Sequence, residues 1–302
     1  MKQTIISDEN GIRIDSYLAK VLDNFSRAYI AGLISDNLIL CNGSVCKPSH
    51  KITIGDEIVT DIPDPKEISA IPQEIPIEIV YEDEYLAVIN KPQGLVVHPA
   101  AGHRDNTLVN ALMFHYKGEL SDLNGVIRPG IVHRIDKDTS GLLLIVKKNE
   151  VHSQIAAAIQ KHEIKRTYRT LVNGIISENE GTIDLPVGRS PSNRLKNAVV
   201  KSGKNAITHF KVIERFYGSN ITYVEVTLET GRTHQIRVHF AYIKHPVLGD
   251  TLYGGARKDF RLDGQTLHAY KLEFLHPVNK NDIMVEAPIP EYFEKLLKLM
   301  RP

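Results

Sequence analysis

Two spacings of hydrophobic residues alternate along this chain of 302 residues. Apolar positions at helical spacing predict helices at residues 11–22, from Ser26 onward, and at residues 107–116, 149–162 and 291–300. Short apolar or alternating runs between turn residues predict strands at residues 38–41, 58–61, 75–80, 85–90, 142–146, 165–172, 222–228 and 265–276. Because strands outnumber helices and mostly follow one another through turns, we expect an α+β fold with a largely antiparallel mixed sheet.

A stretch rich in proline separates two parts of the chain. Ile62-Pro63-Asp64-Pro65-Lys66 has two prolines in three residues, and proline cannot donate a backbone hydrogen bond, so this stretch is typical of a linker. We predict a small domain at residues 1–62, a linker at 63–74 and a larger domain at 75–302. A chain of this length, with 42% hydrophobic residues, has ample apolar content for a buried core.

Composition limits the partners and the surroundings of the protein. The formal net charge is only +1, so a polyanionic partner would have to bind through local basic patches. The two cysteines are Cys41 and Cys46, and this spacing without a nearby histidine pair makes a poor zinc site. The first residues do not resemble a signal peptide, and no stretch offers about 18 uninterrupted apolar residues. We therefore expect a cytoplasmic protein with reduced thiols and no membrane anchor.

The stretch GIVHRIDKDTSGLLLIVKK, residues 130–148, combines apolar and charged positions. Apolar runs at 131–132 and 142–146 flank a polar loop, which predicts a strand, a loop and a second, fully buried strand. The loop presents Arg134 and Asp136 to the pocket expected above it. An isolated Arg-x-Asp is most simply a surface ion pair, which stabilises a protein by about 1 kcal/mol or less. Further motifs along the chain, described below, favour a functional site at this loop over a surface ion pair.

Complementary side chains lie in two other places. Tyr168 falls in a predicted strand, and a turn-rich segment supplies Arg232, His234 and Arg237. An aspartate that faces an arginine stays ionised at physiological pH, so Asp136 would be available as a nucleophile rather than as an acid. The sequence offers it no second carboxylate of the kind that glycosidases use.

A basic run lies between Asp184 and Glu214, where the chain has no acidic residue. Its basic residues are Arg189, Arg194, Lys196, Lys201, Lys204 and Lys211. Such a run is most often a solvated face, and its Asn, Ser, Gly and Pro content is typical of a loop. A mobile basic loop beside a site would also clamp phosphates.

The sequence gives no sign of a metal site or a nucleotide cofactor. The histidines at positions 98, 103, 133, 234 and 239 lack the spacing of HExxH or of Cys/His metal sites. Neither GxGxxG nor GxxxxGK[ST] occurs. We therefore expect neither a metal nor a cofactor.

Four motifs of the larger domain together resemble the RluA family of pseudouridine synthases. They are NKPQGLVVHP, HRIDKDTSGLLL, IKRTYRTLVNG and LETGRTHQIRVHF. The resemblance implies the pseudouridine synthase fold and three catalytic residues. Asp136 matches the catalytic aspartate, Tyr168 the tyrosine that packs on the target uracil, and Arg237 the arginine that pairs with the aspartate.

The resemblance also implies contacts with RNA. Arg134 matches the loop arginine that helps to displace the target nucleotide, and we expect His133 and Arg232 to contact RNA as well. The small domain resembles the S4 RNA-binding module through RIDSYLA, FSRAYI, LILCNG and KITIGDEI, which would place Arg27 at a phosphate. Residues 1–62 hold six Lys/Arg and eight Asp/Glu, so this module would bind RNA only through a local basic face.

The implied activity is that of an isomerase that converts uridine in RNA to pseudouridine without a cofactor. The motifs VVHPAAGH, DLPVGR and PVLGDTLYGG most resemble the RluD-like branch, which acts on helix 69 of large-subunit (23S) ribosomal RNA. Other relatives act on other ribosomal sites or on transfer RNA. The expected partner is structured RNA, either ribosomal RNA or the pre-ribosomal large subunit, and the enzyme is expected to be a monomer.

Two alternatives share part of this pattern. An RNA glycosylase would break the same bond and leave an abasic site, and an inactive synthase fold would only bind RNA. The second is disfavoured because Asp136, Tyr168 and Arg237 are all present. The sequence does not decide whether Asp136 attacks the uracil or the ribose.

Overall fold

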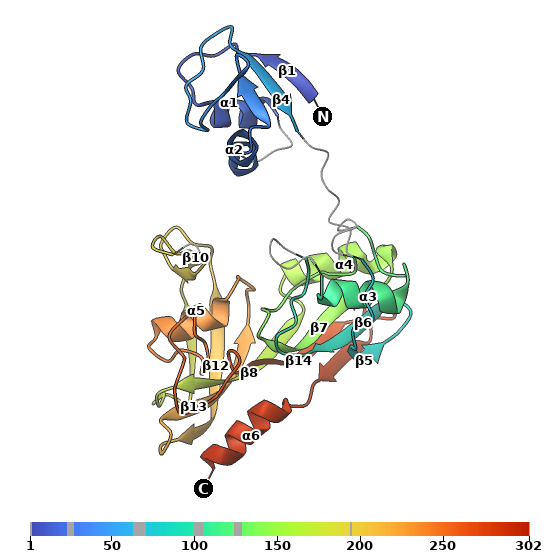
Figure 1. The fold of residues 1–302 in the computed structure, drawn as a ribbon. Helices are drawn as coiled ribbons and strands as arrows, with labels where there is room; N and C mark the ends of the chain where they lie inside the picture. The colour runs from blue at the N-terminus through green and yellow to red at the C-terminus, as the bar shows by residue number, and fades with distance from the viewer. Residues whose placement is uncertain are drawn as a thin grey trace. The chain divides into compact units, whose positions relative to one another are not determined.

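The computed structural model describes residues 2–22, 27–62, 71–99, 105–123, 129–193 and 195–301. It contains two compact units, Met1–Glu67 and Ile68–Pro302 (Figure 1). The predicted helix cap Ser26, residues 63–70 of the predicted linker, His103 and Arg194 lie outside the described residues. The predicted domain boundaries therefore stay a prediction.

The first unit packs two helices on a small sheet. Its elements are β1 (Lys2–Ile6), α1 (Ile14–Val21), α2 (Arg27–Ser35), β2 (Ile39–Cys41), β3 (Ser44–Val45) and β4 (Glu57–Asp61). The strands pair antiparallel in the order β1-β4-β2-β3, and Asn42 and Gly43 form the predicted turn between β2 and β3 with φ of 50° and 70°. The sequence pattern does not predict β1, because this edge strand has no fully buried side chain.

The second unit is built on a nine-stranded sheet in the order β5-β6-β7-β14-β8-β13-β12-β9, with β15 paired to β14 (Figure 1). These strands are β5 (Glu78–Glu82), β6 (Leu86–Lys91), β7 (Ser140–Val146), β8 (Lys165–Asn173), β9 (Glu180–Asp184), β12 (Ile207–Phe216), β13 (Ile221–Leu228), β14 (Leu267–Leu275) and β15 (Asp282–Glu286). Only β7 and β14 pair in parallel among the described strands of this sheet. The expectation of an α+β fold with a largely antiparallel mixed sheet is confirmed.

Helices cover both faces of this sheet. They are α3 (Leu108–Tyr116), α4 (Asn149–Gln160), α5 (Gln235–Tyr242) and α6 (Glu291–Met300). Every side chain of β7 is buried, and alternate residues serve two different cores: Leu143 packs with α3, whereas Leu144 packs with α4. Farther along the sheet, Val224 of β13 shares a core with α5 and Tyr223 shares one with α6. A strand buried on both faces explains the continuous apolar run at residues 142–146.

Two predictions about local structure are wrong. Ile131 forms only an isolated bridge with Ile145, so no strand precedes the polar loop. The basic run is not one long loop, because it folds into a hairpin of β10 (Val187–Arg189) and β11 (Asn197–Val199), followed by β12. A side chain at Gly203 would clash with the Val187 backbone, so glycine lets the returning chain pack on the hairpin.

The loop that contains Asp136 ends where β7 meets β14. Gly141 has a φ of 107°, and a Cβ atom there would overlap the carbonyl oxygen of Ala269 in β14. Only glycine accepts both this backbone conformation and this close approach of two strands. The end of the Asp136 loop is therefore fixed to the centre of the sheet.

Candidate active site

One pocket of the second unit gathers side chains from distant parts of the sequence. It is lined by Arg134 and Asp136 from the loop before β7, by Tyr168 from β8, and by Arg232, His234 and Arg237 from the turn and helix after β13. Antiparallel pairing of β8 with β13 and with β14, and parallel pairing of β14 with β7, bring these segments to one place. The apolar part of the lining comes from Ile135, Leu228, Ile236 and Leu267.

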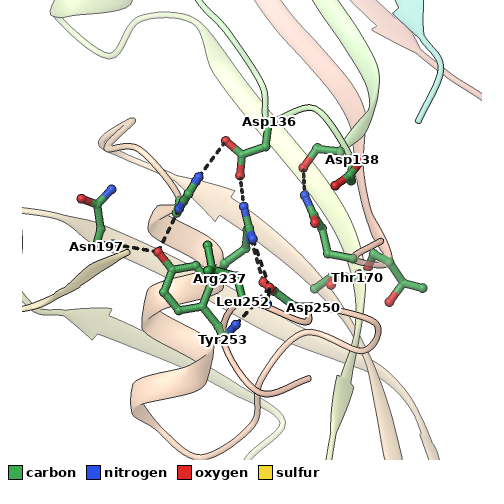
Figure 2. Close-up of polar contacts among 12 residues, drawn as sticks. Asp136, Asp138, Thr170, Asn197, Arg237, Asp250, Leu252 and Tyr253 are labelled. Atoms are coloured by element: carbon green, nitrogen blue, oxygen red, sulfur yellow. Dashed lines mark hydrogen bonds and ion pairs between the residues drawn. The ribbon is translucent and has the colours of Figure 1, made fainter. Parts of the chain in front are cut away.

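Arg237 lies between two carboxylates, Asp136 and Asp250 (Figure 2). Its Nη1 donates to Asp136 Oδ2 at 2.8 Å, while Nε and Nη2 donate to the two oxygens of Asp250 at 2.6 and 3.0 Å. Burial by itself would lower the pKa of Arg237, but the hydrogen bonds and charges of Asp250 and Asp136 raise it above its ordinary value. The predicted contact of Arg237 with Asp136 is therefore present, and the guanidinium is permanently charged.

Asp250 is a member of this group that the sequence analysis missed. Its carboxylate is buried and also accepts the backbone N–H groups of Leu252 and Tyr253 at 3.1 Å. The residue sits in the stretch PVLGDTLYGG, which by itself predicts only a turn. Because a buried carboxylate must be paired, Asp250 holds Arg237 in the orientation that meets Asp136.

Lys91 fixes the backbone next to Asp136. Its side chain is fully buried, and Nζ donates to the carbonyl oxygens of Pro92, Leu95 and Lys137 at 2.8, 2.8 and 2.9 Å. Burial lowers the pKa of Lys91 to about 7. The bond to Lys137 ties the Asp136 loop to the turn after β6, so the NKPQG motif has a structural role beside the pocket.

Tyr168 and Arg134 lie on the pocket as predicted, with different exposure. Tyr168 is 6% exposed, and burial raises the pKa of its phenol, so the ring stays neutral. Arg134 is exposed, and its Nη1 lies 3.4 Å from Nε2 of His98. The tyrosine thus offers a fixed surface, and the arginine a charge at the mouth of the pocket.

The other predicted RNA contacts lie in different surroundings. His133 does not line the pocket; its Nε2 accepts the backbone N–H of Leu144 at 2.9 Å, which holds the loop on β7. Arg232 does line the pocket, and its Nε donates to the Asn205 carbonyl at 2.9 Å. Arg27, in the first unit, is 54% exposed and pairs with Asp15 at 3.2 Å. Their contacts with RNA stay predictions.

One group of described residues has the composition of a metal site. Ligand atoms of Cys41, His50 and Asp56, in the first unit, lie within 4.8 Å of one another. Both oxygens of Asp56 already accept hydrogen bonds, from the Asn42 amide at 2.9 Å and from the Thr53 N–H at 2.7 Å. This carboxylate therefore has a local structural role in the turn before β4.

Comparisons with known proteins agree on one family. A family model described as RNA pseudouridylate synthase matches residues 85–242, and a model of the S4 domain matches residues 12–58. The chain is 44% identical over 298 residues to the uncharacterized RNA pseudouridine synthase YlyB of Bacillus subtilis (strain 168), covering 99% of this chain and 97% of that protein.

Relatives named ribosomal large subunit pseudouridine synthase D are similar over the same length. That of Zymomonas mobilis is 44% identical over 308 residues, covering 98% of this chain and 96% of the relative. That of Escherichia coli (strain K12) is 40% identical over 311 residues, covering 99% of this chain and 93% of the relative.

The fold has a counterpart among solved structures. Human RNA pseudouridylate synthase domain containing 1 superimposes with a TM-score of 0.58 at 23% identity, covering 78% of this chain and 97% of the human chain. This likeness shows the fold. The family-model match and the relatives of 40% identity or more over nearly the whole chain assign the chain to the RNA pseudouridylate synthases, isomerases that convert uridine in RNA to pseudouridine.

Proposed function

We propose that the chain isomerises uridine in large-subunit ribosomal RNA, in the helix 69 region, with Asp136 as the nucleophile. The observation that carries the chemistry is the position of Asp136, at the pocket and bonded to a buried arginine. Relatives named for the ribosomal large subunit, about as long as this chain, support the substrate. The S4 match supports a second contact with structured RNA.

Asp136 is suited to the first step of the reaction. Its Oδ2 bonds to Arg237, and the carboxylate is 18% exposed, so part of it remains accessible from the pocket. Addition to the uracil, or attack on the ribose, would break the N1 glycosidic bond while Asp136 holds one fragment covalently. The uracil then turns and rejoins the ribose through C5. Neither route needs a metal or a cofactor.

Tyr168 and Arg134 are suited to holding a base outside its stack. Removing a nucleotide from a stack costs a few kcal/mol, which an aromatic ring and a cation in the pocket can offset. The buried Tyr168 supplies the aromatic ring, and the exposed Arg134 supplies the cation. The pocket can therefore keep the freed uracil beside the ribose during its rotation.

The β10–β11 hairpin is suited to binding the RNA backbone. Figure 1 shows β10 next to α5, and the Asn197 amide donates to the Thr233 carbonyl at 2.9 Å in the turn that lines the pocket. Lys201 and Lys204 follow the hairpin and are exposed. Exposed lysines that follow this hairpin can neutralise phosphates that flank the target nucleotide.

Pseudouridine mapping tests this proposal. Ribosomal and transfer RNA from cells that lack the protein should miss one or more pseudouridines of helix 69, and wild-type protein should restore them. The Asp136→Asn protein, which keeps the side-chain shape but loses the nucleophile, should not. Restoration by Asp136→Asn, or missing sites only in transfer RNA, would contradict the proposal. Abasic sites in place of pseudouridine would point to a glycosylase.

A further inference from the structure

His234 lies in an unusual backbone conformation at the pocket. It is the residue before α5, with φ of 60° and ψ of 19°, in the left-handed region of backbone conformation that residues other than glycine seldom adopt. The ring lines the pocket together with Asp136 and Tyr168 and is 20% exposed. Non-glycine residues with a left-handed backbone conformation cluster at active sites and ligand-binding sites.

The two ring nitrogens of His234 face different partners. Nδ1 lies 2.8 Å from the hydroxyl of Tyr253, and that hydroxyl also accepts the backbone N–H of Asn197 at 2.9 Å. Nε2 lies 3.8 Å from Asp136 Oδ1, the carboxylate oxygen that Arg237 does not bind. If Nδ1 donates to the Tyr253 oxygen, Nε2 carries a lone pair that faces the pocket.

The groups around this ring decide its charge. They are Asp136, Arg237, Asp250, Arg134 and Tyr253. Burial lowers the pKa of His234, and the two arginines act in the same direction, while the two carboxylates oppose them. The ring is therefore neutral at neutral pH, and a transient imidazolium would lie beside the Asp136 carboxylate.

The isomerisation needs such a group in its last step. When the uracil has rejoined the ribose through C5, that carbon still carries its hydrogen and N1 has none. The C5–H bond must then break, its electron pair forms the C5–C6 double bond, the C6–N1 double bond opens with its electron pair moving to N1, and N1 takes up a proton. One proton leaves C5 and one arrives at N1, so a single neutral base that later gives its proton back balances the step.

We infer that His234 accepts the proton of C5 at Nε2 and returns a proton to N1, while Tyr253 holds its other nitrogen. This role rests on the proposed function, because the uracil that Asp136 helps to free must lie in the same pocket. His234 is then a catalytic residue of the second half of the reaction, whereas Asp136 serves the first half.

A hydrogen isotope at C5 tests this role. The substrate is total RNA from cells that lack the protein, grown with ordinary uridine or with uridine deuterated at C5, so the test does not depend on which uridine is modified. His234→Gln in the full-length protein keeps a polar partner for Tyr253 but is not a base. We expect a rate lowered by about 10²- to 10⁴-fold in single turnover, and a primary isotope effect that the wild type lacks.

Controls separate proton transfer from a role in structure. His209→Gln, at a half-buried histidine of β12 that does not line the pocket, should leave the rate and its isotope dependence unchanged. If His234→Gln unfolds, His234→Ala with added imidazole replaces it, and recovery of the rate by imidazole is the expected result. A rate within about twofold of wild type, a loss without an isotope effect, or no recovery with imidazole would overturn the inference.

The same experiment keeps the two proposals apart. Wild-type turnover that Asp136→Asn abolishes supports the proposed site whatever His234→Gln does. Turnover by Asp136→Asn would refute the proposed nucleophile itself. An unaffected His234→Gln would refute only the transfer of the C5 proton.

Discussion

The charges around Arg237 and the charges after the β10–β11 hairpin differ in burial and in pairing. Arg237 is 7% exposed and bonds to two carboxylates, one of them fully enclosed. Lys201 and Lys204 are exposed, in a run of the chain without acidic residues. A charge removed from water must be held in one geometry by its partners, whereas an exposed lysine can follow a mobile phosphate.

We expect this difference to separate chemistry from RNA binding within one domain. Substitutions of Arg237 or of its carboxylate partners should lower kcat, because they move or neutralise the side chains proposed to react. Changes after the hairpin should raise KM and alter its salt dependence, because they remove phosphate contacts. The predictions below test whether the two regions are as separate as their surroundings indicate.

Arg237→Lys should have the largest effect. A lysine is a point charge and cannot bridge Asp136 and Asp250 with the forked contacts that the guanidinium makes. We expect kcat for pseudouridine formation to fall by about 10²- to 10³-fold with little change in KM. Arg215→Lys is the matched control, because Arg215 bonds to backbone carbonyls away from the pocket. A variant that raised KM alone would show that Arg237 binds RNA instead.

Asp250→Asn should have a smaller effect in the same direction. The amide oxygen can still accept the N–H groups of Leu252 and Tyr253, but it offers Arg237 one oxygen instead of two charged ones. We expect kcat to fall by about 10- to 100-fold, since Asp136 keeps its charge partner in a less fixed position. Steady-state kinetics on ribosomal RNA would measure this loss. Wild-type kcat would mean that Asp136 needs no second carboxylate behind Arg237.

His133→Gln should change the acid stability of the buried region. Burial, assisted by the charge of Arg166, lowers the pKa of His133 to about 3, below its usual value near 6.5. Between these pH values the unfolded chain binds a proton on this ring and the folded chain does not, so the free energy of unfolding decreases as pH falls through that window.

Glutamine can still accept a hydrogen bond from the Leu144 N–H but cannot be protonated. The substitution therefore removes the pH dependence that comes from this ring and keeps the hydrogen bond. Urea unfolding at pH 7 and pH 4 should therefore show a loss of stability that is smaller in the variant by about 3 kcal/mol. An equal loss in both proteins would place the acid sensitivity at other residues.

Removing the two exposed lysines should have the smallest effect. Lys201→Ala with Lys204→Ala should raise KM by about 3- to 10-fold, leave kcat unchanged, and lower the slope of log affinity against log salt by about two. Lys295→Ala with Lys298→Ala removes the same charge from exposed positions of α6. If both double variants behaved alike, the effect would reflect net charge and not the position beside the pocket.

The sequence by itself predicts most elements and most of the pocket. Periodicity identifies the buried strand at residues 142–146 and the amphipathic helix at 291–300, because each pattern depends on neighbours a few residues away. The motifs around Asp136, Tyr168 and Arg237 identify the family, since the same side chains recur in them at fixed local spacing.

Tertiary structure alone decides how those residues meet and what supports them. Arg237 reaches Asp136 across 101 positions of the chain, and Lys91 reaches the Lys137 carbonyl across 46. No local pattern encodes such contacts, so Asp250 and Lys91 appear in the sequence as residues of ordinary turns. Gly203 likewise lets the chain that follows the β10–β11 hairpin pack on Val187. Local spacing thus determines which side chains are available, whereas long-range packing determines which charges are buried and must find partners.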